Sequence, residues 1–342
     1  MNVPAVDLAR IERAAQVLVD GGLVAFPTET VYGLGADADQ RGAVEAIFRA
    51  KGRPADHPLI VHVADAPAAG DWAAVLTPAA QALMKRFWPG PLTLVLPRGE
   101  RAHDALTGGQ GSVGLRCPSH PWARALLQAL GRLAGDGSRA IAAPSANRFG
   151  HISPTLAQHV RAELGQAPGG LVDVILDGGA CPLGIESTIV DLSAGTPRLL
   201  RPGSVTRSAI EQVLGMPVAA VPVDDPSAPR ASGRLARHYA PRRPLQLVAA
   251  ADLAARIDAL GPGRVAVLAP AGARLPPARR WAAPETPQAY AQCLYEFLHA
   301  MDASGAEVLL AQRPPEGEAW VAVNDRLERS AAGLAAPMDD AD

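Results

Sequence analysis

The sequence predicts an α/β protein with two domains, and three observations support this. Short apolar runs typical of buried strands alternate with amphipathic helical patterns along most of the chain. A Pro- and Arg-rich segment of linker composition, residues 224–244, interrupts the alternation. The length of 342 residues exceeds that of one small domain and suits two. We therefore place the domains at 1–223 and 245–336, followed by an acidic tail at 337–342.

The first domain begins with a helix that Asp7 can cap and that Gly21 and Gly22 end. Buried strands follow, with helical patterns between several of them. Residues 172–201 show no helical pattern, which indicates antiparallel hairpins and a mixed sheet. The expected strands are Leu23–Phe26, Leu59–Val63, Leu92–Leu96, Val113–Arg116, Ala140–Ala143, Val172–Leu176 and Thr188–Leu192, and the expected helices are 41–50, 78–87, 121–131 and 155–164.

The second domain repeats the alternation on a smaller scale, which predicts another α/β unit. Its strands are expected at Leu245–Val248, Val265–Leu268 and Val308–Leu310, and its helices at 251–260, 287–302 and 321–332.

Composition and charge narrow the classes of function. Lys and Arg number 32 against 34 Asp and Glu, a net charge of −2, which argues against a protein that coats nucleic acid. The three cysteines lie far apart and form no C-x-x-C pair, so neither a disulfide framework nor a zinc knuckle is expected. No signal peptide and no apolar run of about 20 residues is visible. We expect a cytoplasmic protein with no membrane partner.

Five segments carry more polar, Gly and Pro residues than a packed core needs, and each follows or precedes a predicted strand. Loops at strand ends are where open α/β sheets bind ligands. The segments are Pro27–Gly35, Lys51–Pro54, Ser112–Pro118, Ala142–Asn147 (with Ser153 shortly after) and Gly184–Thr188 (with Leu199–Gly203 beyond it).

The cations in these segments suit a polyphosphate, although structural roles are open too. Lys51 and Arg53 could clamp phosphate oxygens, or serve as ordinary partners of a helix dipole. Arg116 ends a strand and could meet either an anionic ligand or a neighbouring acid. The sequence has no G-x-x-x-x-G-K-[ST] loop and no G-x-S-x-G elbow, so neither P-loop chemistry nor an acyl-enzyme is indicated. Cations and hydroxyls at strand ends indicate a site that acts by positioning its ligands and by charge. Phosphoryl and nucleotidyl transfer require such a site.

In this order, the segments resemble the YrdC-like threonylcarbamoyl-AMP synthases over residues 10–215. Six motifs of the family occur in the sequence. They are P-T-E-T-x-Y-G-L at Pro27–Leu34, K-x-R at Lys51–Arg53 with P-L-I-V-H at Pro58–His62, W-P-G-P-L-T at Trp88–Thr93, A-P-S-A-N at Ala143–Asn147, E-S-T-I at Glu186–Ile189 and L-R-P-G at Leu200–Gly203.

The linker resembles that of the long, two-domain form, because Arg237–Pro241 carries its H-Y-A-P motif. The chain departs from the family pattern of S-P-G-M ahead of that motif, since it reads Ala231-Ser232-Gly233-Arg234 there and so loses the Pro and the Met. His57 also replaces a commoner Asn. We expect residues 230–241 to fold over the cavity as a lid when nucleotide binds. Loss of the Pro and Met at Ser232 and Arg234 should loosen this lid, and Arg234 could add a phosphate contact in exchange.

The resemblance implies a twisted mixed sheet with a central concave cavity and a Rossmann-like C-terminal domain. It implies an enzyme that makes L-threonylcarbamoyl-AMP from L-threonine, bicarbonate and ATP with Mg²⁺, and releases pyrophosphate. A downstream tRNA threonylcarbamoyl transferase would then modify an adenosine beside the anticodon, and a weak tRNA contact is possible within this scheme.

The resemblance also implies the roles of individual residues, with no covalent nucleophile and no metal ligand from the protein. Lys51 and Arg53 would act mainly by positioning and electrostatics. The ATP contacts would be Lys51, Arg53, His57, Ser112, Ser145, Asn147, Ser153, Arg201 and Tyr239, and the L-threonine contacts Thr30, His62, Arg116 (on the substrate carboxylate), Ala143 and Ser187.

Two other functions stay open at this stage. One is a carbamoyltransferase of the same fold, although the extra modules typical of those proteins are not visible in the sequence. The other is a non-catalytic RNA-binding module, which the net charge of −2 disfavours.

Overall fold

The computed structural model describes residues 4–222, 225 and 227–332. The proposed acidic tail, 337–342, and the proposed boundary between 223 and 224 lie outside these residues. The chain folds into two compact units. The first unit runs to Phe149 and continues over Ser153–Arg234, and the second unit joins Gly150–Ile152 to the residues from Leu235 onward.

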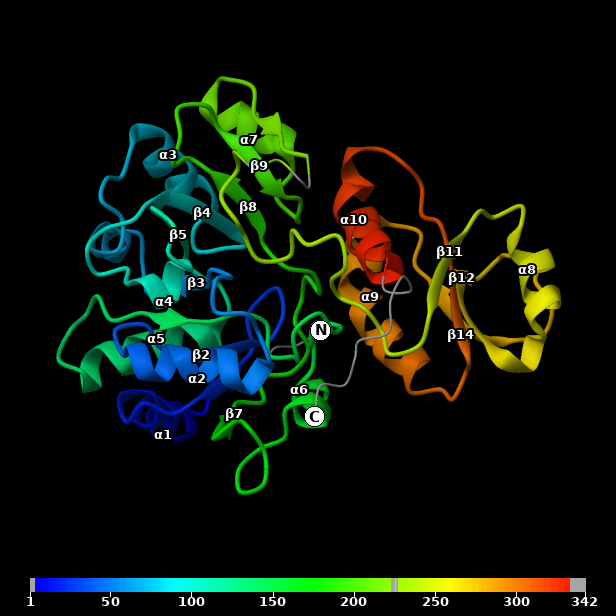
Figure 1. Cartoon of the computed structure of the whole chain (residues 1–342), viewed down its shortest axis with the longest axis horizontal. Coiled ribbons are helices and arrows are strands. Elements are labelled where there is room, and N and C mark those ends of the chain that lie inside the picture. Colours follow the sequence, from blue (N-terminus) through cyan, green and yellow to red (C-terminus); the bar gives the residue numbers. More distant parts are fainter. Residues whose placement is uncertain (1–3, 223–224, 226, 333–342) are drawn as a thin grey trace. The chain divides into compact units, whose positions relative to one another are not determined.

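The strands of the first unit are short and almost all buried. They are β1 (Val24–Phe26), β2 (Gly33–Asp37), β3 (Ile60–His62), β4 (Leu92–Pro97), β5 (Ser112–Arg116), β6 (Ile141–Ala142), β7 (Val174–Ile175), β8 (Thr188–Asp191), β9 (Arg198–Arg201) and β10 (Ala219–Ala220). Within the described residues they form one sheet in the order β10-β9-β8-β4-β5-β3-β6-β2-β1-β7. Figure 1 labels β2, β3, β4, β5, β7, β8 and β9 of this sheet. The sheet contains both parallel pairs, such as β3 with β5, and antiparallel pairs, such as β4 with β5, which confirms the predicted mixed α/β sheet.

Helices cover both faces of this sheet. They are α1 (Leu8–Val19), α2 (Arg41–Lys51), α3 (Pro78–Phe87), α4 (Asp104–Thr107), α5 (Pro121–Leu133), α6 (Ala157–Glu163) and α7 (Arg207–Leu214), with a 3₁₀ turn η1 at Pro67–Asp71. On β1, Val24 and Phe26 pack with α1 and α5, whereas Ala25 joins the larger core beneath α2 and α3. Among the described residues, no helix is long and apolar enough to cross a membrane.

Two features of the first unit differ from the sequence-based expectation. Residues 33–37, expected to begin within a loop, form β2, which pairs antiparallel with both β1 and β6. Residues 172–201 contain one antiparallel pair, β8 with β9, whereas β7 lies parallel to β1 and belongs to no hairpin. Both strands pair with a partner that is distant in the sequence, β2 with β6 and β7 with β1.

The second unit is a smaller parallel α/β layer. Its strands are β11 (Leu245–Val248), β12 (Val265–Pro270), β13 (Arg279–Ala283) and β14 (Val308–Gln312), and its helices are α8 (Leu253–Leu260), α9 (Pro287–Asp302) and α10 (Val321–Ala331), with 3₁₀ turns η2 (Pro262–Arg264) and η3 (Glu318–Trp320). The order is β11-β14-β12-β13, and every pair is parallel. Strand β13 is absent from the sequence-based prediction, because its exposed arginines hide the pattern of a strand.

Candidate functional site

The loop between β1 and β2 is held by its own hydroxyls. The Thr28 Oγ1 donates to the Val31 carbonyl over 2.7 Å and accepts from the backbone N–H groups of Thr30 and Val31. It also lies 2.8 Å from the Thr30 Oγ1. Thr30 is thereby fixed beside the Arg116 guanidinium, whose Nη1 donates to its hydroxyl over 2.9 Å.

Arg116, at the end of β5, forms a buried ion pair with Glu29. Its Nη2 lies 2.7 Å from the Glu29 Oε1, and both side chains are almost fully buried. The other Glu29 oxygen accepts from the Ser119 N–H over 3.1 Å. Of the two partners left open for Arg116, the fold itself therefore supplies the acid. The Arg116 Nε has no hydrogen-bond acceptor among the described residues, so the guanidinium keeps a donor for a further ligand.

His62 lies opposite Arg116 in the register of β3 with β5. Its Nδ1 is 3.2 Å from the Ile60 carbonyl, and its ring meets Phe26 edge to face. Burial, and then the nearby charge of Arg116, lower the pKa of His62 to about 3. The imidazole is therefore neutral at ordinary pH, and its ring interacts with the backbone of both Ile60 and Ile141.

Lys51 ends α2 and connects it to the loop of residues 143–147. Its Nζ donates to the Ser145 carbonyl over 2.5 Å and also to the Asn147 carbonyl. Burial is the main reason that its pKa lies well below the usual value, and the neighbouring Arg53 adds to the shift. Burial therefore disfavours the charged form of Lys51, and an anion bound beside it would stabilise that form.

Arg53 follows Gly52, whose positive φ of 61° ends α2 in the left-handed conformation. The Arg53 Nη2 donates to the Pro58 carbonyl (3.0 Å) and to the Ser232 Oγ (3.2 Å), and its guanidinium faces the Phe149 ring. His57 packs edge to face on the same ring, and burial followed by the charge of Arg53 lowers its pKa. Arg53 and His57 are thus brought together around Phe149.

Arg201, at the end of β9, binds the segment that contains Ser187. Its Nε donates to the Ser187 carbonyl (3.0 Å) and its Nη2 to the Ser187 Oγ (3.1 Å). The Ser187 hydroxyl is also 2.7 Å from the Thr93 Oγ1 on β4. The remaining guanidinium nitrogen, Nη1, donates to the Ser232 carbonyl over 2.9 Å.

The other predicted residues of the first unit lie in the same loops. Ser153 donates to the buried Glu186 carboxylate over 2.6 Å, and the Asn147 side chain donates to the Arg148 carbonyl. Ala143 is buried just beyond β6, and Ser112 begins β5 beside a small cavity.

Thirteen of the fourteen predicted contacts thus lie in the first unit, and Tyr239 belongs to the second. Tyr239 is buried there, with a φ of 62°, its ring under the Arg326 guanidinium and its carbonyl accepting from Ser330. The roles assigned to all fourteen residues remain predictions.

Sequence reasoning missed three polar residues: Glu29, Thr93 and Glu186. Each lies inside a family motif and contacts a predicted residue, namely Arg116, Ser187 and Ser153 respectively. For the two glutamates, the signal available in the sequence was an acidic residue inside a motif that follows or precedes a predicted strand. Among the described residues, no group of three or more His, Cys, Asp or Glu side chains could hold a metal ion.

The first part of the predicted lid, residues 230–234, belongs to the first unit, and the rest belongs to the second. Ser232, expected to loosen the lid, contacts both Arg53 and Arg201. Arg234, expected at a phosphate, is buried and donates to the carbonyls of Pro222 and Pro229. Neither replacement leaves its position without contacts.

Two family models match the chain. One, for the Sua5, YciO and YrdC proteins, carries the description "Telomere recombination" and matches residues 16–203. The other is described as "Threonylcarbamoyl-AMP synthase, C-terminal domain" and matches residues 205–332. Together they cover nearly all of the described chain.

Relatives match over nearly their full length. The threonylcarbamoyl-AMP synthase of Pyrococcus abyssi is 38% identical over 335 residues, which cover 94% of each chain. That of Bacillus subtilis is 39% identical and covers 95% of this chain and 93% of its own. The crystal structure of the P. abyssi Sua5 protein complexed with L-threonine superposes with a TM-score of 0.85, at 37% identity and 96% coverage of both chains.

Proposed function

The chain belongs to the threonylcarbamoyl-AMP synthase family, and from this premise we propose that it joins L-threonine, bicarbonate and ATP into L-threonylcarbamoyl-AMP. The observation that carries the proposal is the match of both family models in succession, over residues 16–203 and 205–332. The first unit would bind the substrates, because it holds the basic and hydroxyl-bearing loops described above.

The reaction takes two steps in this proposal. The threonine amine nitrogen attacks the bicarbonate carbon, and loss of water leaves a carbamate. A carbamate oxygen then attacks the α-phosphorus of ATP, the bond to the bridging oxygen breaks, and pyrophosphate leaves with that electron pair. Mg²⁺ would enter with the ATP phosphates and offset their charge. No enzyme nucleophile takes part.

The threonine subsite is proposed around Arg116. The free Nε donor of this buried guanidinium suits a substrate carboxylate, and Glu29 holds the same guanidinium from the other side. The neutral imidazole of His62 adds no second positive charge beside Arg116. The hydroxyls of Thr30 and Ser187 and the backbone of Ala143 would be the remaining threonine contacts of this proposal, and all three residues are buried.

The nucleotide subsite is proposed around Lys51, Arg53 and Arg201. Phosphoryl-transfer enzymes act mainly by positioning and by charge stabilisation, and three buried cations supply both. Because Lys51 is desolvated, an approaching polyphosphate gains more from it than from a lysine in water. His57, Ser112, Ser145, Asn147, Ser153 and Tyr239 are the further ATP contacts of this proposal.

The product would pass to a tRNA threonylcarbamoyl transferase, since a mixed anhydride of a carbamate with AMP is an activated acyl donor. Any contact of the chain itself with tRNA would be weak, in line with its net charge of −2.

The test is to incubate the purified chain with ATP, Mg²⁺, bicarbonate and a panel of amino acids, and to identify the products by mass. The expected result is L-threonylcarbamoyl-AMP together with pyrophosphate, dependent on both threonine and bicarbonate. Pyrophosphate release that is independent of threonine, or transfer of a carbamoyl group from carbamoyl phosphate, would refute the proposal.

A further inference from the structure

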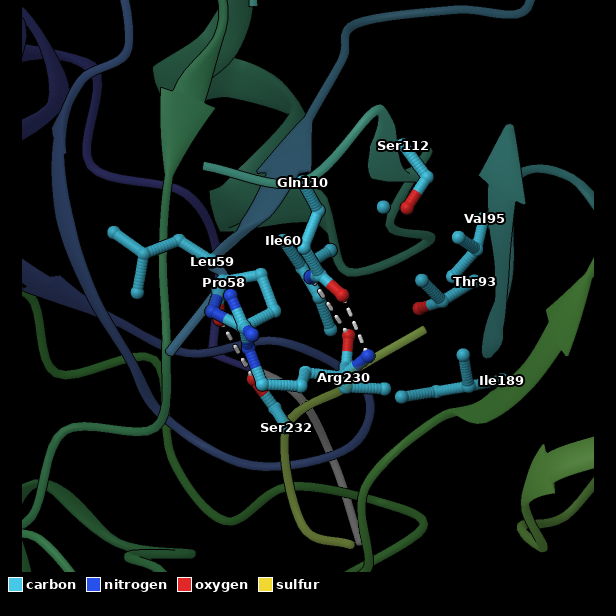
Figure 2. A pocket seen from close by; sticks show the side chains of 12 residues that line it. Pro58, Leu59, Ile60, Thr93, Val95, Gln110, Ser112, Ile189, Arg230 and Ser232 are labelled. Carbon is cyan, nitrogen blue, oxygen red and sulfur yellow. Dashed lines mark hydrogen bonds between the residues drawn. The ribbon is translucent and has the colours of Figure 1, made fainter. Parts of the chain in front are cut away.

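Glu186 is a buried carboxylate with no role in the reaction proposed above. Its side chain lies just before β8 and accepts a hydrogen bond of 2.6 Å from the Ser153 hydroxyl. Strand β8 is paired with β4 on one side and β9 on the other. Figure 2 shows Thr93 and Ile189, register partners on β4 and β8, side by side. Because the sheet fixes the strand that follows, the position of Glu186 is fixed as well.

The contacts of Glu186 place it between the two proposed subsites. Ser153, which donates to it, is a proposed ATP contact. The next residue, Ser187, is a proposed threonine contact, and its hydroxyl is fixed by Thr93 and by the Arg201 Nη2. The threonine nitrogen must react near this boundary, because the carbamate that it forms attacks the α-phosphorus of ATP.

Threonine brings an ammonium group into a part of the molecule that is rich in positive charge. Lys51, Arg53, Arg116 and Arg201 are all almost fully buried there. A further cation beside them is unfavourable, because water screens charges poorly in a buried site. A carboxylate at the position of the nitrogen would offset this cost. It would both hold the ammonium group and be able to take a proton from it.

The buried carboxylates of the first unit differ in their surroundings. Among the described residues there are four of them. Asp37 and Asp191 each form an ion pair with an arginine outside the family motifs (2.8 and 2.6 Å). Glu29 has Arg116 on one oxygen and a backbone N–H on the other. Of these four, Glu186 is the one that adjoins residues of both proposed subsites.

We propose that the Glu186 carboxylate binds the ammonium group of threonine and accepts the proton that this group must lose before it reacts. The N–H bond breaks, the proton moves to a carboxylate oxygen, and the electron pair stays on the nitrogen. The amine then attacks the bicarbonate carbon, water leaves and a carbamate remains. The proton held by Glu186 passes to solvent, so that one proton is released for each carbamate formed. The identity of the reaction rests on the proposed function, whereas the ammonium site rests on these contacts and charges.

The binding experiment uses Glu186→Gln, because the amide oxygen can still accept from Ser153 whereas the charge is lost. Calorimetry without ATP measures the binding of L-threonine and of 2,3-dihydroxybutyrate, which carries a hydroxyl in place of the ammonium group. We expect the Kd for threonine to rise about tenfold or more and the Kd for the analogue to change less than about twofold. Glu100→Gln, at an exposed position, is the matched control and should change neither. Glu186→Asp keeps the charge and should retain more of the threonine binding.

The kinetic experiment follows the formation of threonylcarbamoyl-AMP between about pH 7 and about pH 9. At the lower pH, kcat/KM for threonine should fall about 100-fold or more in Glu186→Gln, as expected for loss of a general base. The loss should shrink as the pH rises, because the solution then supplies more threonine with a free amine. The Kd for ATP should not rise, since removal of a negative charge does not weaken the binding of phosphates.

Equal weakening of threonine and 2,3-dihydroxybutyrate binding would overturn the proposal, because Glu186 would then only support the shape of the site. A loss of activity that stays constant with pH would overturn the proton transfer. Recovery of Glu186→Gln in excess Mg²⁺ would overturn the proposal in favour of a metal ligand. If the unchanged chain makes no threonylcarbamoyl-AMP, the proposed function fails, and the comparison of the two ligands still decides whether Glu186 holds the ammonium group.

Discussion

The Arg116 guanidinium and the Glu29 carboxylate form an ion pair 2.7 Å apart, in which each side chain is about 5% exposed (5% and 6%). The pair joins the loop after β1 to the end of β5. Removing one partner of a buried pair leaves the other charge desolvated and uncompensated, which is far more costly than loss of a surface pair.

The first prediction follows from this pair. Glu29→Ala should lower the free energy of unfolding by about 3–5 kcal/mol. The control is Glu12→Ala, which breaks the exposed pair of Glu12 with Arg132 and should cost about 1 kcal/mol or less. Urea denaturation measures both. Equal small losses in the two variants would show that Glu29 does not stabilise the buried guanidinium.

The second prediction concerns acid stability. The pKa of His62 is about 3 in the fold, against the usual 6.5, so between these pH values the unfolded chain binds one more proton at this site. The contribution of His62 to stability is therefore present above pH 6.5 and declines as the pH falls toward 3. His62→Gln should lose less stability than the unchanged chain between pH 6.5 and 4.5. Parallel stability curves over that range would contradict a neutral, buried His62.

The third prediction concerns the cations. Lys51→Ala and Arg53→Ala should each slow adenylate formation about 30- to 1,000-fold, because each removes roughly 2–4 kcal/mol of transition-state stabilisation. Arg49→Ala is the matched control, because Arg49 lies in the same last turn of α2 but is exposed. Pyrophosphate release under saturating threonine measures the effect. Folded Lys51 or Arg53 variants as active as Arg49→Ala would remove those residues from the site.

Local signals were sufficient for several elements of the fold. Helix α3 spans the predicted 78–87, because Thr77 caps it with its hydroxyl and Pro78 occupies its first turn. Strand β2 could not be found this way. Its Gly35 looks like part of a loop, yet a Cβ there would lie 2.7 Å from the Ile141 side chain, so the glycine serves close packing between strands.

The site was predicted as a set of residues but not as a set of contacts. The motif order placed Lys51 with Ser145 and Asn147, and the Lys51 ammonium does bind the carbonyls of both. The sequence did not show that Arg116 contacts Glu29, because a buried arginine can pair either with an acid of the protein or with an anionic ligand, and the sequence pattern is the same in both cases. The contacts of Ser232 with Arg53 and Arg201 depend on where a linker returns to the sheet, which no local pattern encodes.

The last prediction concerns the choice of amino acid. The proposed threonine subsite includes the buried hydroxyls of Thr30 and Ser187, which already form hydrogen bonds with Arg116, Thr93 and Arg201. Serine lacks only the methyl group of threonine, which is worth about 1–3 kcal/mol in an apolar niche. Valine keeps the shape but lacks the hydroxyl, so it leaves a buried polar group without its partner.

Discrimination against such an analogue is stronger than discrimination against a missing methyl group. We therefore expect kcat/KM to fall in the order threonine, serine, valine, with valine the poorest by at least a further factor of about ten. Competition assays that monitor each adenylate by mass measure the ratios directly. Because α-aminobutyrate lacks the hydroxyl but keeps the methyl group, it serves as the control that separates lost hydrogen bonding from altered shape. If valine and α-aminobutyrate react as fast as serine, the substrate hydroxyl has no buried partner, and the niche selects by shape alone.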